Sequence, residues 1–434
     1  MGGLGLLGCR SLVAAGLYLQ YRADRLGRAA ADEGADRPLP GDEGQGRVRA
    51  RGTALNATGF PVAAELPQGT RIVHVVRQFL PNRGGLEDVV SNLCKAQLRL
   101  GLRPSVVTLN RLFVEPDRLL PAREVIDGIP VTRIPFRGSS RYPLAPSVFA
   151  HLRDADIVHV HAIDFFFDAL ALGRLVHGKK LVATTHGGFF HSGDYASLKE
   201  LWFRSVTRLS ARAYRGLAAC SAADAVRFQA IAGERVMLIE NGVDIAKFAG
   251  AASPVPRRRL VSIGRFSKNK RPDRLIATMR DLASRDPDWH LDLVGVASDW
   301  TGPALRAAIA KAGMERHVSL HLGLGDDEVR RLLGQASLFV SASEFEGFGL
   351  VLIEALSAGL VPVVQPNAAF SGLASELSAV RLADFSRPEA AADAITAAFE
   401  ALRVAGGLDP DVARQISHYS WDDVARRYLA LYTR

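Results

Sequence analysis

Two glutamates near the C-terminus, Glu346 and Glu354, have a spacing that suits a nucleotide sugar. A turn with glycines at 347 and 349 separates them and leads into an apolar run from Leu350. One carboxylate could hold a sugar hydroxyl, the amides of the turn could hold phosphate oxygens, and the second carboxylate could accept a ribose diol. A surface turn followed by an exposed helical glutamate is the alternative, because such spacing is common by chance.

The elements around the turn would position both carboxylates. A strand is expected over Leu338–Ser341 and a helix from about Leu350. The first N–H groups of a helix have no partner within it and carry positive dipole charge, so they can bind an anion. Glycines on both sides of Phe348 would let a ligand approach the backbone. Glu354 would then lie about one turn into the helix, with Glu346 at the mouth of the loop.

A basic segment, Gly-Arg-Phe-Ser-Lys-Asn-Lys at 264–270, follows another expected strand, Leu260–Gly264. Arg265 and Lys270 could neutralise the negative charge that develops on a departing diphosphate, without a metal ion. A solvated basic turn is the alternative. The two glutamates downstream favour the functional interpretation.

Two loops of the N-terminal half could also contact a ligand. Gly84 and Gly85 follow the first expected strand, 71–76, although the dinucleotide pattern G-x-G-x-x-G is absent. His186 comes directly after an expected strand over Lys180–Thr185. An ordinary glycine turn and a structural histidine are the alternatives at these two places.

Other charged residues have simpler explanations. Asp326-Asp327 precedes an expected helix, so helix N-capping explains the pair better than a metal site does. No metal and no cofactor are expected. The segment Lys199–Arg215 carries arginines at helical spacing beside aromatic residues, which suits an anionic lipid surface or a solvated basic face equally well.

The whole chain shows two series of alternating strands and helices, which is typical of parallel sheets wrapped by helices. The fold class is therefore α/β, with two Rossmann-like doubly wound domains whose ligands bind beyond the carboxyl ends of the strands, in a cleft between them. The expected organisation has four parts: an extension over 1–70, partly disordered, domains over 71–255 and 256–415, and a C-terminal helix over 416–434 that could cross back to the first domain.

Composition limits the partners. A net charge of +9 favours anionic partners, and no nucleic-acid-binding motif is present. Three distant cysteines fit a reducing, cytosolic setting. The apolar stretch at 4–21 is interrupted by Arg10, which leaves either a short membrane-surface helix or an extension without a role in the fold.

Taken together, these motifs resemble the retaining GT-B glycosyltransferases of the group 1 type over about residues 71–434. The residues that carry the resemblance are Gly84-Gly85, His186, Asn241–Asp244, Arg265, Lys270, Glu346, Glu354 and 358–364. A narrower likeness, at 75–79, 136–143, 163–166 and 186–191, is to the bacterial α-mannosyltransferases of xanthan and acetan assembly. These enzymes move mannose from GDP-mannose to cellobiosyl-diphosphopolyprenol.

The resemblance implies a role for each candidate residue. His186, Glu346 and Lys270 would be catalytic. The donor would be bound by Arg265, Lys270, Glu346, Gly347, Phe348, Gly349, Leu350, Glu354, Gly84 and Gly85, and the acceptor by Asp164 and Ser221. Helix capping is the safer role for Ser221. Two departures from the family pattern affect donor specificity: Arg271 stands where a glycine usually follows the lysine, and 365–370 lacks the familiar glycine pair.

The expected enzyme is a metal-independent mannosyltransferase that forms an α linkage, peripheral on the inner face of the cytoplasmic membrane. Its partners would be GDP-mannose, a polyprenyl-diphosphate-linked glycan and an anionic membrane surface. Three alternatives remain at this point: a UDP-glucose or UDP-galactose transferase, a catalytically silent GT-B subunit, and an NAD-type oxidoreductase, which the missing glycine fingerprint disfavours.

Overall fold

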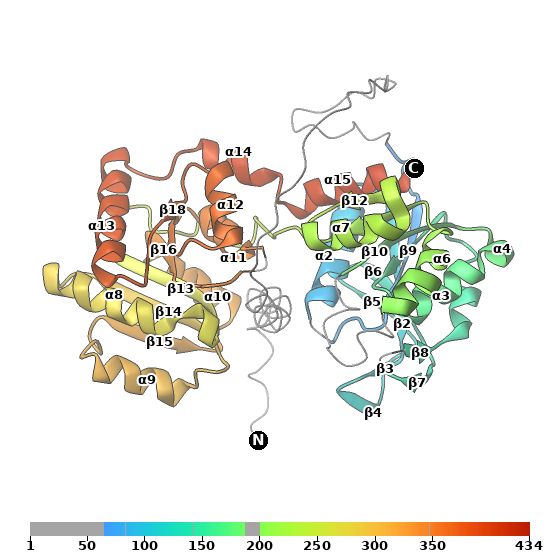
Figure 1. The fold of residues 1–434 in the computed structure, drawn as a ribbon, viewed down its shortest axis with the longest axis horizontal. Helices are drawn as coiled ribbons and strands as arrows, with labels where there is room; N and C mark the ends of the chain where they lie inside the picture. The colour runs from blue at the N-terminus through green and yellow to red at the C-terminus, as the bar shows by residue number, and fades with distance from the viewer. Residues whose placement is uncertain (1–64, 83, 141, 187–199, 347) are drawn as a thin grey trace, which may run out of the picture. The chain divides into compact units, whose positions relative to one another are not determined.

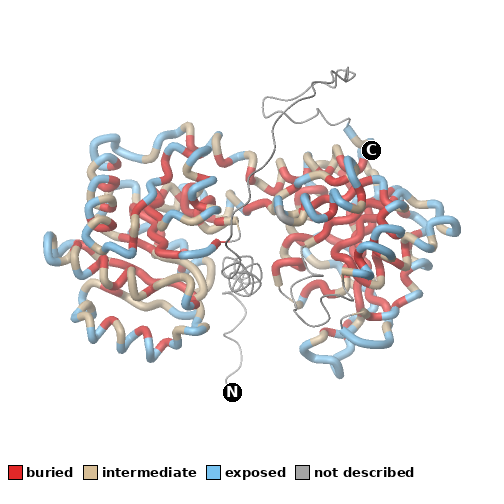
Figure 2. The backbone as a smooth tube through the Cα atoms, in the orientation of Figure 1, coloured by how far each residue is buried: buried red, intermediate tan, exposed pale blue. Residues whose placement is uncertain are grey.

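The computed structural model describes residues 65–82, 84–140, 142–186, 200–346 and 348–434, which form two compact units. The N-terminal unit takes 65–82, Leu93–Glu240 and Val424–Arg434, and the C-terminal unit takes Asn241–Asp423 with Arg83–Asn92. Each unit is built around one large sheet covered by helices (Figure 1). The strands run through the buried part of each unit (Figure 2).

The N-terminal sheet has the strand order β12-β11-β10-β9-β1-β2-β6-β5, and all neighbours are parallel except β5 and β6. Its strands are β1 (Arg71–Val75), β2 (Arg103–Leu109), β5 (Arg123–Ile126), β6 (Ile129–Ile134), β9 (Ile157–His161), β10 (Lys180–Thr184), β11 (Gly216–Ala219) and β12 (Val236–Leu238). Two small hairpins pair β3 (Arg111–Leu112) with β4 (Glu115–Leu119), and β7 (Arg137–Ser139) with β8 (Tyr142–Leu144).

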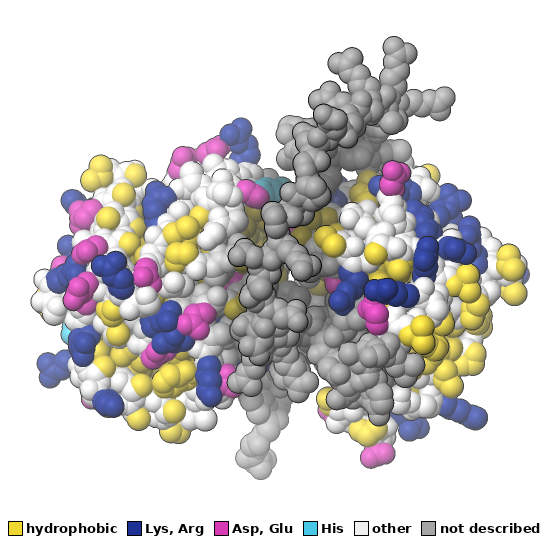
Figure 3. All heavy atoms as spheres, viewed as in Figure 1, with side chains coloured by type: hydrophobic (Ala, Val, Ile, Leu, Met, Phe, Trp, Pro, Cys, Tyr) yellow, Lys and Arg dark blue, Asp and Glu magenta, His cyan; other side chains and the backbone are white. Residues whose placement is uncertain are grey.

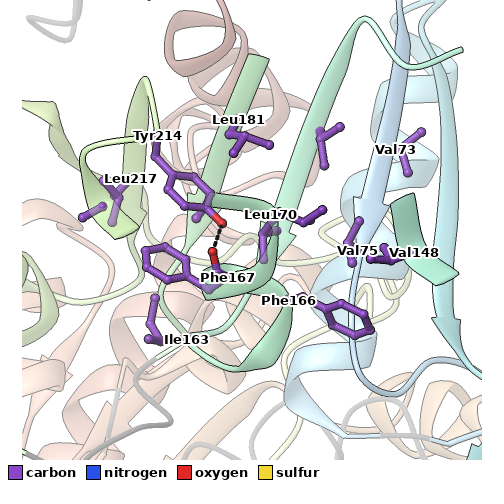
Figure 4. Packing of buried hydrophobic residues seen from close by; sticks show 14 of the residues in the cluster. Val73, Val75, Val148, Ile163, Phe166, Phe167, Leu170, Leu181, Tyr214 and Leu217 are labelled. Carbon is purple, nitrogen blue, oxygen red and sulfur yellow. Dashed lines mark hydrogen bonds between the residues drawn. The ribbon is translucent and has the colours of Figure 1, made fainter. Parts of the chain in front are cut away.

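Helices cover this sheet, and apolar residues from both fill the space between them. The helices are α2 (Gly85–Arg99), which belongs to this unit from Leu93 on, α3 (Phe165–Leu172), α4 (Arg174–His177), α6 (Arg208–Ala211), α7 (Ala222–Ala232) and α15 (Trp421–Tyr432), which belongs to it from Val424 on. Figure 4 shows part of this core, where the ring of Tyr214 stacks on Phe167 at 4.4 Å between centroids. The Tyr214 hydroxyl donates to the Phe167 carbonyl at 2.8 Å, so its polar atom is satisfied inside an apolar cluster.

The C-terminal sheet has the order β15-β14-β13-β16-β17-β18, and all neighbours are parallel. Its strands are β13 (Arg259–Phe266), β14 (His290–Ala297), β15 (Val318–Leu322), β16 (Leu338–Ser341), β17 (Val361–Val364) and β18 (Arg381–Leu382). Its helices are α8 (Pro272–Arg285), α9 (Gly302–Lys311), α10 (Asp326–Leu333), α11 (Leu350–Ala358), α12 (Ala368–Glu376), α13 (Pro388–Ala405) and α14 (Asp411–Ser417). Two apolar clusters, one holding Leu293 and the other Phe339, pack this unit.

Each strand expected from the sequence is confirmed, with ends that differ by a few residues. The edge strands β5, β12 and β18 and the strands of the two hairpins were not predicted. The three edge strands are only two to four residues long, which is too short for a clear pattern. The stretch before β13 packs with the C-terminal unit, since the amides of Gly250 and Ala252 donate to the carbonyls of Ser357 and Ala358 in α11. Among the described residues, no helix is long and apolar enough to span a membrane.

Candidate functional site

In the C-terminal sheet, β13 and β16 are neighbours at the point where the chain's connections reverse direction. From β13 the chain continues to β14 on one side, and from β16 it continues to β17 on the other. A doubly wound sheet binds ligands beyond the carboxyl ends of such strands. The two charged motifs expected from the sequence follow these strands, with Lys270 after β13 and Glu346 after β16. The topology therefore brings the two motifs to one switch point.

Lys270 and Glu346 form an ion pair there, with 2.6 Å between Lys270 Nζ and Glu346 Oε1. Their side chains are only 15% and 7% exposed. A Cβ placed on Gly264 would lie 3.7 Å from Lys270 Cε, so the lysine stem lies against the backbone of β13. Charges this well buried need a partner, because an isolated one would carry a large desolvation cost.

Backbone hydrogen bonds join the two loops that carry this pair. The Glu344 amide donates to the Asn269 carbonyl at 2.8 Å, and Asn269 Nδ2 donates to the Phe345 carbonyl at 3.1 Å. Ser343 Oγ also donates to the Phe345 carbonyl, at 2.9 Å. One main-chain bond and one side-chain bond between the loops, both just before Glu346 in the sequence, thus help to set its position relative to Lys270.

Gly349 precedes α11 in a left-handed conformation with a φ of +82°. A Cβ here would lie 3.0 Å from Leu373 Cδ1 and 3.1 Å from Phe370 Cε1, so a larger residue would meet both strain and crowding. Leu350 begins α11, as expected, and Phe348 packs edge-on against Tyr419 at 6.1 Å between centroids. Gly347 lies outside the described residues.

Arg271 also adopts a left-handed conformation, with a φ of +48°. This is the position where the sequence departs from the family's glycine, and a non-glycine residue costs about 1 kcal/mol in this conformation. Its guanidinium pairs with Asp273 at 2.7 Å and with Glu344 at 2.6 Å, and Arg274 reaches the same Glu344 oxygen at 2.8 Å. The arginine thereby ties the start of α8 to the loop that carries Glu346, which sequence reasoning missed.

Glu354 lies in α11 in a different electrostatic environment. Burial of its carboxyl, opposed by the charge of Lys247 and reinforced by Asp244 and Asp326, raises its pKa to about 8. Lys247 Nζ lies 2.8 Å from Asp326 Oδ1. The capping role expected for Asp326 and its neighbour is wrong: Gly325 caps α10, because the carboxylate of Glu328 accepts the Gly325 amide at 2.8 Å.

Three other candidates follow the neighbouring strands β9, β10 and β11 of the N-terminal unit: Asp164, His186 and Ser221. Ser221 caps α7, and its hydroxyl accepts the Asp224 amide at 3.2 Å. Asp164 caps α3, where it accepts the Phe166 amide at 2.9 Å.

The Asp164 carboxylate also has an ionic partner, since Arg77 Nε lies 3.1 Å from it. Burial, only partly offset by Arg77, raises the pKa of Asp164 to about 6. Gly85 begins α2, and the Gly84 carbonyl accepts the Asp88 amide at 2.9 Å. These contacts establish structural roles for Asp164, Ser221 and Gly84 and leave their part in substrate binding as a prediction.

His186 has a left-handed backbone, with a φ of +49°. Its Nε2 lies 2.9 Å from His161 Nδ1, and its Nδ1 lies 3.8 Å from Cys220 Sγ. Behind it, the ring nitrogens of His74, His159 and His161 lie close enough together to hold a metal ion, within 4.8 Å of one another. The sequence did not predict this buried cluster, because His74 comes from β1 and the other two from β9.

Comparisons with known proteins agree with this architecture. Residues 83–247 match the family model described as Glycosyltransferase Family 4, and residues 245–401 match that of the Glycosyl transferases group 1. The GDP-mannose:cellobiosyl-diphosphopolyprenol alpha-mannosyltransferase of Xanthomonas oryzae pv. oryzae is 42% identical, over 83% of this chain and 96% of its own length. The protein of the same name from Komagataeibacter xylinus is 42% identical, over 83% and 92%.

Among solved structures, a glycosyltransferase from Rickettsia africae superposes with a TM-score of 0.60 at 18% identity, covering 84% of this chain and 98% of its own. Sucrose-phosphate synthase from Thermosynechococcus elongatus superposes with a TM-score of 0.57 at 16% identity, covering 84% and 98%. This likeness concerns the fold, which is the GT-B fold of two Rossmann-like domains. The identity with the curated relatives, which extends over most of the chain, establishes more: the chain belongs to the group 1 glycosyltransferases.

Proposed function

We propose that this chain transfers mannose from GDP-mannose to a lipid-linked oligosaccharide of the cellobiosyl-diphosphopolyprenol kind, with an α linkage, in exopolysaccharide biosynthesis. The observation that carries the proposal is the 42% identity, over nearly their whole length, to two relatives named for that reaction. The ion pair of Lys270 and Glu346 at the β13–β16 switch point supports it, because both charges suit the donor.

The donor would lie along the C-terminal switch point. Arg265 and Lys270 would bind its diphosphate, and the first amides of α11 would add positive dipole charge. Glu346 would accept a hydroxyl of mannose, and Glu354 would bind the ribose diol. In the free enzyme Glu346 holds the Lys270 ammonium, so the lysine is already oriented before a diphosphate arrives.

The transfer itself would proceed with retention and without a metal ion. The departing phosphate oxygen would take the proton of the acceptor hydroxyl on the same face of the sugar, while Arg265 and Lys270 stabilise the charge on the diphosphate. No side chain is assigned as a covalent nucleophile. His186 would lie at the reaction centre, Gly84 and Gly85 near the anomeric carbon, and Asp164 and Ser221 toward the acceptor.

A surface of the N-terminal unit would dock on the inner face of the cytoplasmic membrane, where a polyprenyl-linked acceptor resides. We call it the basic face; it consists of the exposed arginines Arg204, Arg208, Arg212 and Arg215, next to the exposed apolar residues Leu201, Trp202 and Leu209. Figure 3 shows Lys and Arg side chains gathered on this side of the unit. Arginines beside apolar and aromatic side chains suit anionic lipid headgroups.

A donor screen tests the reaction. Purified full-length protein is incubated with radiolabelled GDP-mannose, UDP-glucose or UDP-galactose and a lipid-linked cellobiose. We expect label transfer from GDP-mannose alone, retained in the presence of EDTA, with α configuration of the product by NMR. Transfer from a UDP-sugar instead would replace the donor, and no transfer from any of the three would support a silent subunit.

Sedimentation with vesicles tests the membrane part. Binding to anionic vesicles should weaken as salt rises, because screening reduces the attraction between arginine and lipid charges. Replacing Arg204 and Arg208 by serine should weaken binding further, whereas Arg285→Ser, an exposed arginine of the C-terminal unit, serves as the matched control. Salt-independent binding would point instead to the apolar N-terminus.

A further inference from the structure

A continuous chain of hydrogen bonds runs through the buried interior of the N-terminal unit, from helix α15 to His186. Its members lie in β1, α2, β9, β10 and α15, apart from His186, which follows β10, and all of them except His186 are buried. The links are Gln97–Tyr432 (2.9 Å), Gln97–His74 (2.8 Å), His74–His161 (2.9 Å), His161–His186 (2.9 Å), Tyr432–His159 (2.9 Å), His159–Thr184 (2.7 Å) and Thr184–Tyr428 (3.1 Å).

The hydrogen bonds of this network have a direction, because each neutral imidazole has one N–H donor and one acceptor nitrogen. Gln97 Oε1 can only accept, so His74 Nε2 carries the proton that faces it. His74 Nδ1 must then accept from His161 Nε2. His161 Nδ1 in turn must accept from His186 Nε2. In its neutral form His186 is then unprotonated at Nδ1, which faces the thiol of Cys220.

The amide nitrogen of Gln97 sets the direction of the second branch. It donates to the Tyr432 hydroxyl, which is then free to donate to His159 Nδ1. His159 Nε2 carries a proton and donates to Thr184 Oγ1, whose own hydrogen can pass to Tyr428. Turning the Gln97 amide over would require every proton in both branches to reverse. The tautomers of the histidines in this network are therefore coupled to the side-chain amide of Gln97 on α2 and the hydroxyl of Tyr432 on α15.

Burial keeps the imidazoles of His74, His159 and His161 neutral, as this argument needs. It lowers the pKa of His74 to about 4 and lowers those of His159 and His161 well below the usual value of 6.5. The same three rings are close enough to bind a metal ion. Each of their nitrogens, however, already faces a hydrogen-bond partner within the protein, so a metal would have to displace these bonds.

We propose that helix α15, acting through Tyr432, Gln97 and His74, keeps a proton on Nε2 of His186 and fixes its ring. These three residues are positioning residues, since they act on His186 through other side chains. The step from His186 to catalysis rests on the proposed function. The proton on Nε2 does not, because it follows from the hydrogen bonds of the N-terminal unit alone.

The tautomer can be read directly in the full chain labelled with ¹⁵N-histidine. Long-range ¹H–¹⁵N correlation distinguishes a protonated ring nitrogen from an unprotonated one, and the spectrum of His186→Gln identifies the signals of His186. At a pH where His186 is neutral, we expect a protonated Nε2 and an unprotonated Nδ1. In Gln97→Leu the fixed acceptor is lost, so both nitrogens of His186 should move toward averaged positions. Gln97→Glu keeps the acceptor and should restore the original pattern.

Kinetics add a readout that loss of stability alone would not produce. Gln97→Leu and Tyr432→Phe should lower kcat for mannosyl transfer by about tenfold while leaving the donor KM nearly unchanged, as expected when only the geometry of the reacting complex suffers. The matched control is Tyr214→Phe. This change removes another buried tyrosine hydroxyl of the same unit, which donates to the Phe167 carbonyl and is not part of the hydrogen-bond network. It should leave kcat and the His186 spectrum unchanged.

Several results would overturn the proposal. They are a wild-type His186 without a proton on Nε2, an unchanged His186 spectrum in Gln97→Leu, equal losses of kcat in Tyr432→Phe and Tyr214→Phe, and stoichiometric zinc bound to the purified protein and lost on replacing His74. If the wild type transfers no mannose, the proposed function fails, while the spectra still decide whether the hydrogen-bond network orients His186.

Discussion

The two units place ionisable side chains near the carboxyl ends of their strands in opposite ways. In the C-terminal unit the groups are charged and paired, as in Lys270–Glu346 and Arg271–Glu344. In the N-terminal unit one charged pair, Arg77–Asp164, is accompanied by neutral histidines linked in a row, from His74 through His161. The arrangement in the C-terminal unit holds charges that a diphosphate or a sugar hydroxyl can engage. The histidine row has no charge to offer and serves to hold position.

The same contrast appears in the pKa values. Burial raises the pKa of Glu354 to about 8, and it lowers the pKa of His74 to about 4. Both shifts favour the neutral form, because removing a charge from water is unfavourable in either unit. For a carboxyl the neutral form is the protonated one, and for an imidazole it is the deprotonated one. The two units therefore respond to pH with opposite signs.

The largest expected effect concerns the ion pair of Lys270 and Glu346. Lys270→Ala and Glu346→Ala should each lower kcat by a factor on the order of 10²–10⁴, because the diphosphate or the sugar loses a charged partner in a partly buried site. Circular dichroism should show an intact fold. Arg285→Ala, which breaks an ion pair to Asp393 at the surface, should leave turnover normal. Near-normal turnover in either site variant would refute the assignment.

The second effect is on stability, and its sign differs between the units. His74 is deprotonated in the fold down to pH about 4 but binds a proton below 6.5 when unfolded. Its contribution is complete above 6.5 and is lost as the pH falls from 6.5 to about 4, at a cost of roughly 3 kcal/mol. His159 and His161 act in the same direction, and Asp164, whose pKa is raised to about 6, opposes them in part.

Glu354 has the opposite sign. It stays protonated in the fold up to pH about 8 but ionises above 4.5 when unfolded, so it destabilises the C-terminal unit as the pH rises through that window. Hydrogen exchange, corrected for intrinsic rates, should therefore show β1 and β9 losing protection at low pH and α11 losing it at high pH. Parallel pH profiles of protection in the two regions would contradict the opposite signs expected for the two units.

The third effect tests whether Glu354 binds the ribose in its protonated form. Glu354→Gln has a neutral side chain of the same shape and should keep the donor KM at pH 7 within about threefold of the wild type. Glu354→Leu should raise the KM by about 10- to 100-fold, because one or two hydrogen bonds to the diol are lost. A wild-type KM that changes near pH 8, and a constant one in Glu354→Gln, would identify the titrating group. A large KM for Glu354→Gln at pH 7 would show that the charged form binds.

The smallest effect concerns Arg271. Arg271→Ala loses the ion pairs to Asp273 and Glu344 and keeps the left-handed strain, whereas Arg271→Gly loses the same pairs and relieves the strain. Urea unfolding should therefore find the glycine variant about 1 kcal/mol more stable than the alanine variant. Both should raise the donor KM by a similar small factor, since both release the loop of Glu346. Equal stability of the two variants would mean that the strain is absent.

The sequence predicted the C-terminal unit better than the N-terminal one, and the reason is physical. Lys270 and Glu346 are 76 positions apart, but each follows a strand, and parallel strands bring their carboxyl ends to one sheet edge. The strand pattern was therefore enough to bring them together. Gln97 and Tyr432 are 335 positions apart on two helices, and no periodicity tells which faces of α2 and α15 meet. Their contact depends on how the helices pack.

Local rules also had limits. The expected capping by Asp326 was wrong because the helix begins one residue earlier than that role requires. Gly325 is the N-cap residue, and its amide donates to the Glu328 carboxylate. The expected capping by Ser221 was confirmed, since its hydroxyl reaches the Asp224 amide. Arg271 was recognised as a departure from the family pattern, but its ion pairs became visible only with the loop of Glu344 in place.

By itself, the sequence determined the alternation of strands and helices, the two doubly wound sheets and the two charged motifs, because each follows from a short-range pattern of apolar and polar residues. Only the tertiary structure decided that Lys270 is held by Glu346, that Glu354 is kept from ionising, and that His74, His161 and His186 form one directed row. Charge state and hydrogen-bond direction depend on which atoms remain in contact with water. That is a property of the packed chain and not of any segment of it.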